Sequence, residues 1–253
     1  MTDVRVSVTD GLGRIVLCRP PLNILTVHML TRLRAELEAL VAETSLRVLL
    51  LSAEGEHFSA GADVREHLPP DYRSMIPEFL QTVAAIDAFP LPVIAAVQGR
   101  CLGGGFELVL PADLIVAGES AQFGQPEIAL GVAAPAACAL LPRMAAPGVV
   151  AELLFMGDPI GARGAERAGI VRRVVPDDEL ERTALDLAER IARHSAAALR
   201  VTKRMVRRTR DLDWSASFAL VGALYCDELM ATADAREGLR AFVEKRRPVW
   251  SHQ

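Results

Sequence analysis

Strand-sized apolar runs recur along the first half of the chain. Continuously apolar segments, which are typical of strands buried on both faces of a sheet, occupy residues 47–52, 92–97 and 114–117. Ahead of them, residues 5–8 and 14–19 flank a glycine-containing turn, which predicts a β-hairpin at the start of the fold. Helix-sized stretches separate the apolar runs, and this β-α-β-α order predicts an α/β core with parallel strands.

Two helices are predicted between these strands. Apolar residues recur at helical spacing from Val27 to Val41, and Thr26 can act as the N-cap of that helix. Residues 74–89 have a similar pattern. There Pro77 limits where the helix can begin, because proline lacks the N–H of a helical hydrogen bond.

The pattern changes after about residue 135. Apart from a strand predicted over residues 170–175, nearly all of the remainder has a helical pattern, including one long stretch from Asp177 to about Arg210. No repeat, low-complexity segment or obvious linker interrupts the chain. We therefore expect a core over residues 1–195 that holds the functional site, followed by a C-terminal helical region over residues 196–253.

Composition narrows the class of protein. Residues of the set AVILMFWYC make up 51% of the 253 residues, which excludes disorder as a description of the whole chain. A net charge of −4 argues against a surface built to neutralise phosphates. No apolar run reaches the length of a membrane span, and the N-terminal residues lack the pattern of a secretory signal.

Cysteine and histidine spacing bears on location and metal binding. The four cysteines are far apart with no C-x-x-C motif, and the five histidines include no i,i+4 pair. These spacings argue against a zinc site and against a disulfide framework, so the reducing cytoplasm is the expected location. The chain also lacks a phosphate-binding P-loop, a complete dinucleotide fingerprint and a G-x-S-x-G nucleophile motif.

Two glycine-bearing turns and two acidic residues are the candidate chemistry. Residues 57–64 and 98–107 each follow an apolar strand, and their glycines let a ligand approach backbone N–H groups, so that each turn can donate to one shared oxygen. Glu107 and Glu127 lie on apolar backgrounds, where two acids can share a water molecule as base and acid. Alternatively, the turns are only tight connections, and each glutamate caps a helix or pairs with an arginine.

These segments resemble, in order and spacing, the signature motifs of the enoyl-CoA hydratase/isomerase (crotonase) superfamily. The matching segments are His57-Phe-Ser-Ala-Gly-Ala-Asp63, Gly99-Arg-Cys-Leu-Gly-Gly-Gly-Phe-Glu107, Phe123-Gly-Gln-Pro-Glu127, Arg19-Pro-Pro-Leu-Asn23 and the segment from Glu237 to Pro248. The resemblance implies an α/β fold with a crotonase-like ββα spiral core and a C-terminal helical trimerisation region. It also implies a homotrimer or hexamer.

The resemblance further implies a reaction and its residues. The backbone N–H groups of Ala62 and Gly104 are expected to form an oxyanion hole for the thioester carbonyl of an acyl-CoA substrate. Glu107 and Glu127 are expected to hold the water that adds across the α,β double bond. No metal or redox cofactor is implied, because coenzyme A is part of the substrate.

Coenzyme A contacts are also implied by resemblance. The family places one segment around the adenine end of CoA, and in this chain the matching residues include Ala60, Asp63, Val64 and Arg65. Phe242 and Lys245 match residues that reach toward the nucleotide phosphates in relatives, often from a neighbouring subunit. Arg19 lies near the expected CoA path. The alternative for residues 245–247 is an ordinary solvated basic end.

One loop departs from the common hydratase pattern. Pro135 falls where relatives place a glycine whose N–H helps hold the catalytic water, and proline has no N–H to donate. Both glutamates remain, so hydration stays the leading hypothesis, with an acyl pocket formed by residues 64–80 and 128–140. This loop looks more like that of the cyclohexa-1,5-diene-1-carbonyl-CoA hydratases of anaerobic aromatic degradation.

Two other functions compete with hydration. An isomerase of the same superfamily would move a double bond with a single glutamate. A remote alternative is RNA binding, because Arg200, Lys203, Arg204, Arg207 and Arg208 form a basic stripe at helical spacing. The acidic total and the lack of interleaved aromatic residues favour a solvated or intersubunit face for this stripe instead.

Overall fold

A computed structural model describes residues 3–252 of the chain. Its main sheet has six strands in the order β1-β2-β3-β4-β6-β9. These are β1 (Val4–Thr9), β2 (Leu12–Leu17), β3 (Val48–Ala53), β4 (Val93–Val97), β6 (Leu114–Gly118) and β9 (Arg173–Val175). β1 and β2 form the predicted antiparallel hairpin, and every later pairing in this sheet is parallel, which confirms the predicted core.

Three short strands form a second sheet in the order β5-β7-β8. They are β5 (Arg100–Leu102), β7 (Gln122–Gly124) and β8 (Ile160–Gly161). β5 and β7 pair in parallel, so the turn that follows each of them leaves the same end of this small sheet.

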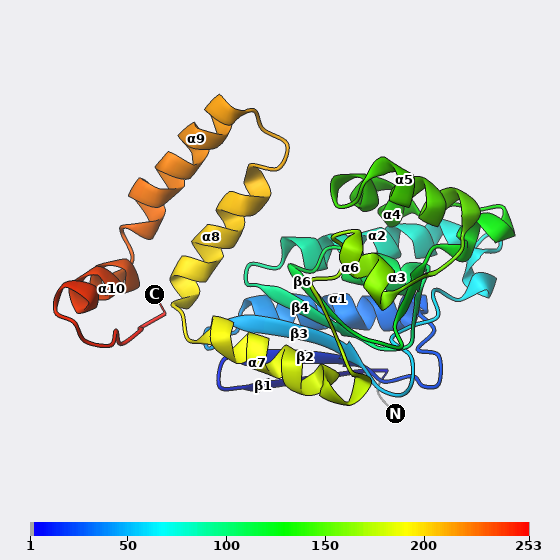
Figure 1. The fold of residues 1–253 in the computed structure, drawn as a ribbon, viewed down its shortest axis with the longest axis horizontal. Coiled ribbons are helices and arrows are strands. Elements are labelled where there is room, and N and C mark those ends of the chain that lie inside the picture. Colours follow the sequence, from blue (N-terminus) through cyan, green and yellow to red (C-terminus); the bar gives the residue numbers. More distant parts are fainter. Residues whose placement is uncertain (1–2, 253) are drawn as a thin grey trace.

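Successive residues of the central strands face two apolar layers. Leu49 and Leu51 of β3 belong to a large cluster with α1 (Val27–Val41) and α2 (Tyr72–Ala88). Val48 and Leu50 pack on the other face against α7 (Leu180–Ala192), which lies across the strands in Figure 1. The continuous apolar runs of the sequence are therefore strands covered by helices on both faces.

Two predicted helical segments need correction. α2 begins at Tyr72, ahead of Pro77, and burial of Met75 and Phe79 on either side of the proline holds the turn together although the Pro77 N–H is missing. The stretch from Asp177 to Arg210 is not one helix. It breaks between α7 and α8 (Ala196–Arg208), where the Ser195 side chain caps the new helix by accepting a hydrogen bond from the Ala198 N–H at 3.2 Å.

The remaining helices are mostly short. They are η1 (Val64–His67), α3 (Gly104–Val109), η2 (Pro126–Leu130), α4 (Pro135–Leu140), η3 (Leu141–Arg143), α5 (Pro147–Ala151), η4 (Glu152–Met156), α6 (Ala162–Arg167), η5 (Asp177–Glu179), α9 (Trp214–Ala223), η6 (Leu224–Leu229) and α10 (Ala233–Val243). Residues 170–172 lie outside β9, so the observed strand is shorter than the one predicted over residues 170–175.

The helices α8 to α10 extend away from the body of the molecule (Figure 1). No residue of α9 is buried, and its apolar side chains, such as Trp214 and Phe218, face solvent. Within residues 3–252, no single helix is long and apolar enough to cross a membrane. One helix pair, Trp214–Leu229 with Ala233–Val243, meets that test of length and composition when the two helices are taken together, and the pair is bent by 86° at the break between them. The division at residue 195 stays a prediction.

Candidate active site

A cavity of about 230 Å³ opens between η1, α2, α3, η2 and α4. Its wall includes residues from both segments that were expected to form the acyl pocket, 64–80 and 128–140. Among the described residues that line it, His67, Glu107 and Glu127 are the ones with titratable side chains, and the rest are glycine, proline or apolar residues. Such a wall suits an apolar ligand portion with a few polar contacts.

Two unpaired backbone N–H groups meet at this cavity. A Cβ atom placed on Gly104 would lie 3.5 Å from the Ala62 nitrogen, so the two turns are in close contact. Gly104 is the first residue of α3, whose N–H has no partner within the helix. Within residues 3–252, neither the Ala62 N–H nor the Gly104 N–H donates a hydrogen bond. The structure thus brings the two predicted donors together at one cavity.

Asn23 and Ser59 hold the first turn in place. The buried Asn23 amide donates to the carbonyl oxygens of Glu54 and His57 at 2.9 and 2.8 Å. The Ser59 hydroxyl donates to the Asn23 carbonyl at 2.8 Å and accepts from the Gly61 N–H at 3.2 Å. The sequence motif contained Asn23 but did not reveal this role, because its partners lie more than 30 residues away along the chain.

Glu107 is buried on the first turns of α3. Its Oε1 accepts a hydrogen bond from the Ala137 N–H at 2.9 Å. Burial raises the pKa of Glu107 to about 7, the negative charge of Glu127 acts in the same direction, and the Ala137 hydrogen bond opposes both. A carboxyl group with this pKa can both hold and release a proton near neutral pH.

Glu127 lies in η2 and faces the same cavity. A Cβ atom on Gly103 would lie 2.5 Å from Glu127 Oε1, so only glycine leaves room for the carboxylate. Glu127 Oε2 is buried and has no hydrogen-bond partner among the described residues. Burial raises the pKa of Glu127, and the positive charge of His67 partly opposes that rise.

Pro135 begins α4 and lines the cavity. Its missing N–H costs the helix nothing, because the first N–H groups of a helix have no partner within the helix. The Ala137 N–H, two residues further on, is the donor that α4 gives to Glu107. Pro135 therefore removes one N–H donor from this loop, and the N–H donor of Ala137 remains in use.

Several residues expected at the CoA path lie at or near the cavity. Ala60 and Val64 line it, and Val64 is exposed. The Asp63 carboxylate caps η1 by accepting a hydrogen bond from the Arg65 N–H at 2.9 Å, which lowers the pKa of Asp63, and the charge of Arg19 lowers it further. The exposed side chains of Arg65 and Arg19 thus lie near the Asp63 carboxylate that caps η1.

Phe242 and Lys245 are not brought to this cavity within the chain. Phe242 is the next-to-last residue of α10. Its side chain is 84% exposed and does not line the cavity. Figure 1 places α10 at the opposite end of the molecule from α2, α3 and α4, and Lys245 lies two residues beyond the end of α10. Within one chain α8 to α10 extend away from the body, so the expected contact of these two residues with CoA, often from a neighbouring subunit, stays a prediction.

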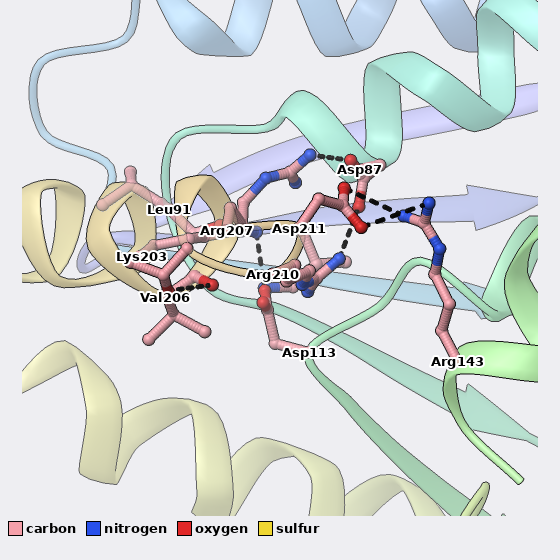
Figure 2. Close-up of polar contacts among 11 residues, drawn as sticks. Asp87, Leu91, Asp113, Arg143, Lys203, Val206, Arg207, Arg210 and Asp211 are labelled. Carbon is pink, nitrogen blue, oxygen red and sulfur yellow. Dashed lines mark hydrogen bonds and ion pairs between the residues drawn. The ribbon is translucent and has the colours of Figure 1, made fainter. Parts of the chain in front are cut away.

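The basic stripe of α8 is largely used inside the chain (Figure 2). The buried Lys203 ammonium donates to Asp113 Oδ2 at 2.6 Å and to the Leu91 carbonyl at 2.8 Å. Arg207 forms an ion pair with Asp87. The interpretation of this stripe as a solvated or intersubunit face is wrong for Lys203 and Arg207, because these cations dock α8 on its own body. The same pairing removes the basis for phosphate binding by these two residues.

Within residues 3–252, no three His, Cys, Asp or Glu side chains are grouped so that they could hold a metal ion. The polar groups of the cavity are thus two carboxyls, one imidazole and two backbone donors. Such a set can bind a carbonyl oxygen and move protons next to it.

Comparison with known proteins agrees with this arrangement. A family model described as enoyl-CoA hydratase/isomerase matches residues 7–253. Cyclohexa-1,5-dienecarbonyl-CoA hydratase of Thauera aromatica is 39% identical over 245 residues, which cover 96% of this chain and 95% of that protein. 2,3-Dehydroadipyl-CoA hydratase of Escherichia coli (strain K12) is 37% identical over 251 residues, with 98% of each chain covered.

The crystal structure of an enoyl-CoA hydratase from Bacillus anthracis superposes on this fold with a TM-score of 0.94 and 33% identity, covering 99% of this chain and 100% of that one. Likeness of this extent includes the C-terminal helices as well as the sheet. With the family model matched over nearly the whole length and the family's donor and carboxyl positions gathered at one cavity, this chain is an enzyme of the enoyl-CoA hydratase/isomerase family with the crotonase fold.

Proposed function

We propose that this enzyme adds water across the α,β double bond of an enoyl-CoA thioester. The observation that carries the proposal is the meeting of the free Ala62 and Gly104 N–H groups with the buried carboxyl of Glu107 and the half-buried carboxyl of Glu127 in one largely apolar cavity. The hydratase names of the relatives from Thauera aromatica and Escherichia coli support the same reaction.

In the proposed reaction the thioester oxygen accepts hydrogen bonds from the Ala62 and Gly104 N–H groups. Water forms its new C–O bond at Cβ, one glutamate takes the proton that water loses, and the π electrons move to give an enolate oxygen. The enolate then collapses as the other glutamate protonates Cα. Removing one oxyanion donor costs about 3–4 kcal/mol in comparable sites, so these donors are expected to be the largest single contribution.

The chemistry asks for no redox partner, since water addition transfers no electrons to or from a cofactor. Coenzyme A enters and leaves as part of the substrate. The carboxyl pair suits the two proton transfers because burial raises the pKa of both members, and the charge of Glu127 raises that of Glu107 further. The isomerase alternative needs one carboxyl only and would leave the other buried glutamate without a task.

For the acyl group we propose a compact apolar unit, with a cyclic dienoyl-CoA as the first candidate. The apolar side chains of the cavity, its volume of about 230 Å³ and the name of the relative from Thauera aromatica support this choice. The test measures hydration of crotonyl-CoA and of cyclohexa-1,5-diene-1-carbonyl-CoA by the wild type, Glu107→Gln and Glu127→Gln. Full activity in both variants contradicts the mechanism, and a preference for crotonyl-CoA contradicts the ring assignment.

We also propose that the chain assembles as a homotrimer or hexamer and acts in the cytoplasm. The exposed apolar side chains of α9 and α10, among them Trp214 at 79% and Phe242 at 84%, support burial against a second copy. Phe242 and Lys245 would then reach the CoA site of a neighbouring subunit. Light scattering on the purified protein tests the assembly, and a monomeric mass contradicts it. The free thiols of the four cysteines are compatible with a reducing compartment.

A further inference from the structure

Ser59 ties the first turn of the cavity to the strand that leads into the second turn. Its N–H donates to the Arg100 carbonyl and its carbonyl accepts from the Leu102 N–H, each at 3.0 Å. Both partners belong to β5, and Gly104 lies two residues beyond the end of that strand. The buried Ser59 is thus a link between the turn that carries Ala62 and the turn that carries Gly104.

Every backbone N–H from Phe58 to Asp63 except that of Ala62 donates to a partner among the described residues. The acceptors are, in chain order, the carbonyls of Gln98, Arg100 and Leu22, the Ser59 hydroxyl, and the Leu25 carbonyl. In this set the Ser59 hydroxyl is the acceptor that a side chain supplies, and it takes the Gly61 N–H at 3.2 Å. The Ser59 hydroxyl therefore helps to determine which N–H of the turn stays free for a ligand.

The direction of the Ala62 N–H follows from the pairing of its turn with another stretch of backbone. The Gly61 carbonyl accepts from the Leu25 N–H at 2.9 Å. In a trans peptide the carbonyl and the next N–H point in opposite directions, so the Ala62 N–H points away from Leu25. The Ser59 hydroxyl holds both stretches in this register, because it donates to the Asn23 carbonyl at 2.8 Å and accepts from the Gly61 N–H.

Contact between Ser59 and α3 sets how closely the two turns approach. A Cβ atom on Gly105 would lie 2.6 Å from the Ser59 Cβ and 2.8 Å from its carbonyl and hydroxyl oxygens. Gly105 lies within α3 and has no positive φ, so glycine is needed there for this contact and not for its backbone conformation. A Cβ atom on Gly61 would in turn lie 3.3 Å from the Leu102 carbonyl oxygen. The two turns therefore pack backbone against backbone, with the small Ser59 side chain at the contact.

From these contacts we propose that Ser59 is a positioning residue that sets the spacing between the Ala62 and Gly104 N–H groups. The inference rests on the function proposed above, in which both donors must reach one thioester oxygen. Ser59 does not line the cavity, so it acts through the two turns and touches no substrate. Disturbing it should weaken polarisation of the thioester carbonyl more than binding of the CoA thioester.

A spectroscopic probe reports on the two donors. 2,4-Hexadienoyl-CoA is a conjugated thioester whose ultraviolet band moves to longer wavelength as its carbonyl oxygen accepts stronger hydrogen bonds, because excitation moves electron density onto that oxygen. Ser59→Ala removes the hydroxyl, and Gly105→Ala places a methyl group against Ser59 with the hydroxyl still present. Thr82→Val is the matched control, because the buried Thr82 hydroxyl donates to the Glu78 carbonyl at 2.9 Å and does not line the cavity.

Ser59→Ala and Gly105→Ala should each lose most of the red shift that the wild type gives to bound 2,4-hexadienoyl-CoA. In Gly105→Ala, widening the contact from 2.6 to 3.4 Å separates the turns by about 0.8 Å. We expect kcat for crotonyl-CoA to fall by about 10–100-fold in both variants while KM stays within about threefold. Thr82→Val should keep the red shift and kcat, although it also loses a buried hydroxyl and should lower Tm about as much as Ser59→Ala.

A full red shift in Ser59→Ala and Gly105→Ala overturns the positioning role. Equal losses of kcat in Ser59→Ala and Thr82→Val also overturn it, because general destabilisation would produce that result. Since the two test variants disturb the contact from opposite sides, either one decides the question if the other does not fold. A wild type that binds the thioester with no red shift counts against the role as well. A wild type that gives the red shift without hydrating crotonyl-CoA contradicts the proposed function and leaves the role of Ser59 supported.

Discussion

Replacing Gly103 by alanine should separate the placement of Glu127 from general stability. Gly103 has φ 51° and ψ −129°, a region that side-chain-bearing residues rarely adopt, so strain alone costs about 1–3 kcal/mol. The new methyl would lie 2.5 Å from Glu127 Oε1. To restore a contact of 3.4 Å, the carboxylate must move by about 0.9 Å. Misplacement of about 1 Å costs about 100-fold in rate in comparable sites.

The expected result for Gly103→Ala is a loss of about 100-fold in kcat/KM for crotonyl-CoA. The strain should lower Tm by about 2–12 °C, since 1 kcal/mol corresponds to roughly 2–4 °C in a chain of this size. Gly169→Ala is the matched control, because Gly169 also has a positive φ (81°) but its Cβ would meet its nearest atom at an ordinary 3.7 Å, away from the cavity. Its Tm should fall while kcat/KM stays within threefold. If Gly103→Ala also kept kcat/KM within threefold, the reasoning about the Glu127 position would be refuted.

Three further predictions concern the buried charges. Glu107→Gln and Glu127→Gln should each lower kcat by about 100-fold or more while the fold is retained by circular dichroism, and a loss below tenfold in both contradicts the acid–base assignment. Because the pKa of Glu107 is raised from 4.5 to about 7, the folded state holds this proton more tightly than the unfolded chain does. The resulting stabilisation of the fold is about 3 kcal/mol. It is present in full below about pH 4.5 and is lost as the pH rises through 7. Glu107→Gln should therefore raise Tm at pH 8 and not at pH 4.5, and equal shifts at both pH values contradict the buried ionisation. Lys203→Met should destabilise the fold by about 1–3 kcal/mol in urea unfolding at fixed protein concentration, because the hydrogen bonds of the buried ammonium to the Leu91 carbonyl and to Asp113 are lost. A neutral Lys203→Met contradicts the docking role of this side chain.

Elements that depend on contacts between residues close together in the sequence were predictable. The Thr26 side chain accepts a hydrogen bond from the Met29 N–H at 3.3 Å, and both residues lie within one turn. The strand β3 is recognisable because every residue from Val48 to Leu51 is apolar and buried on one face or the other. Such features depend on neighbours in the chain, which a single sequence contains.

Features that depend on contacts between residues far apart in the sequence were not predictable. The sequence predicts a helix over residues 74–89 with Pro77 limiting its start, whereas burial of Met75 and Phe79 against other helices holds a start at Tyr72. Lys203 looks like one member of a solvated stripe, and its partners Leu91 and Asp113 lie about 90 or more positions away. Nothing near Lys203 in the sequence signals that it is buried.

The candidate site divides in the same way. The glycine turns and the two glutamates are dense local motifs, and the structure gathers them at one cavity. Asn23 is a single residue whose role depends on where Ser59 lies in space, so the sequence around it did not reveal that role. Phe242 cannot be assigned from one chain, since α10 extends away from the body.

Isotope transfer from water tests the proposed reaction most directly. The enzyme is incubated with crotonyl-CoA, and separately with cyclohexa-1,5-diene-1-carbonyl-CoA, in water enriched in oxygen-18. The masses of the products are then measured by mass spectrometry. We expect one oxygen-18 atom on the former double bond in at least one product, and its loss in Glu107→Gln and Glu127→Gln. Products that carry a moved double bond and no oxygen-18 would contradict hydration and assign the chain to isomerisation.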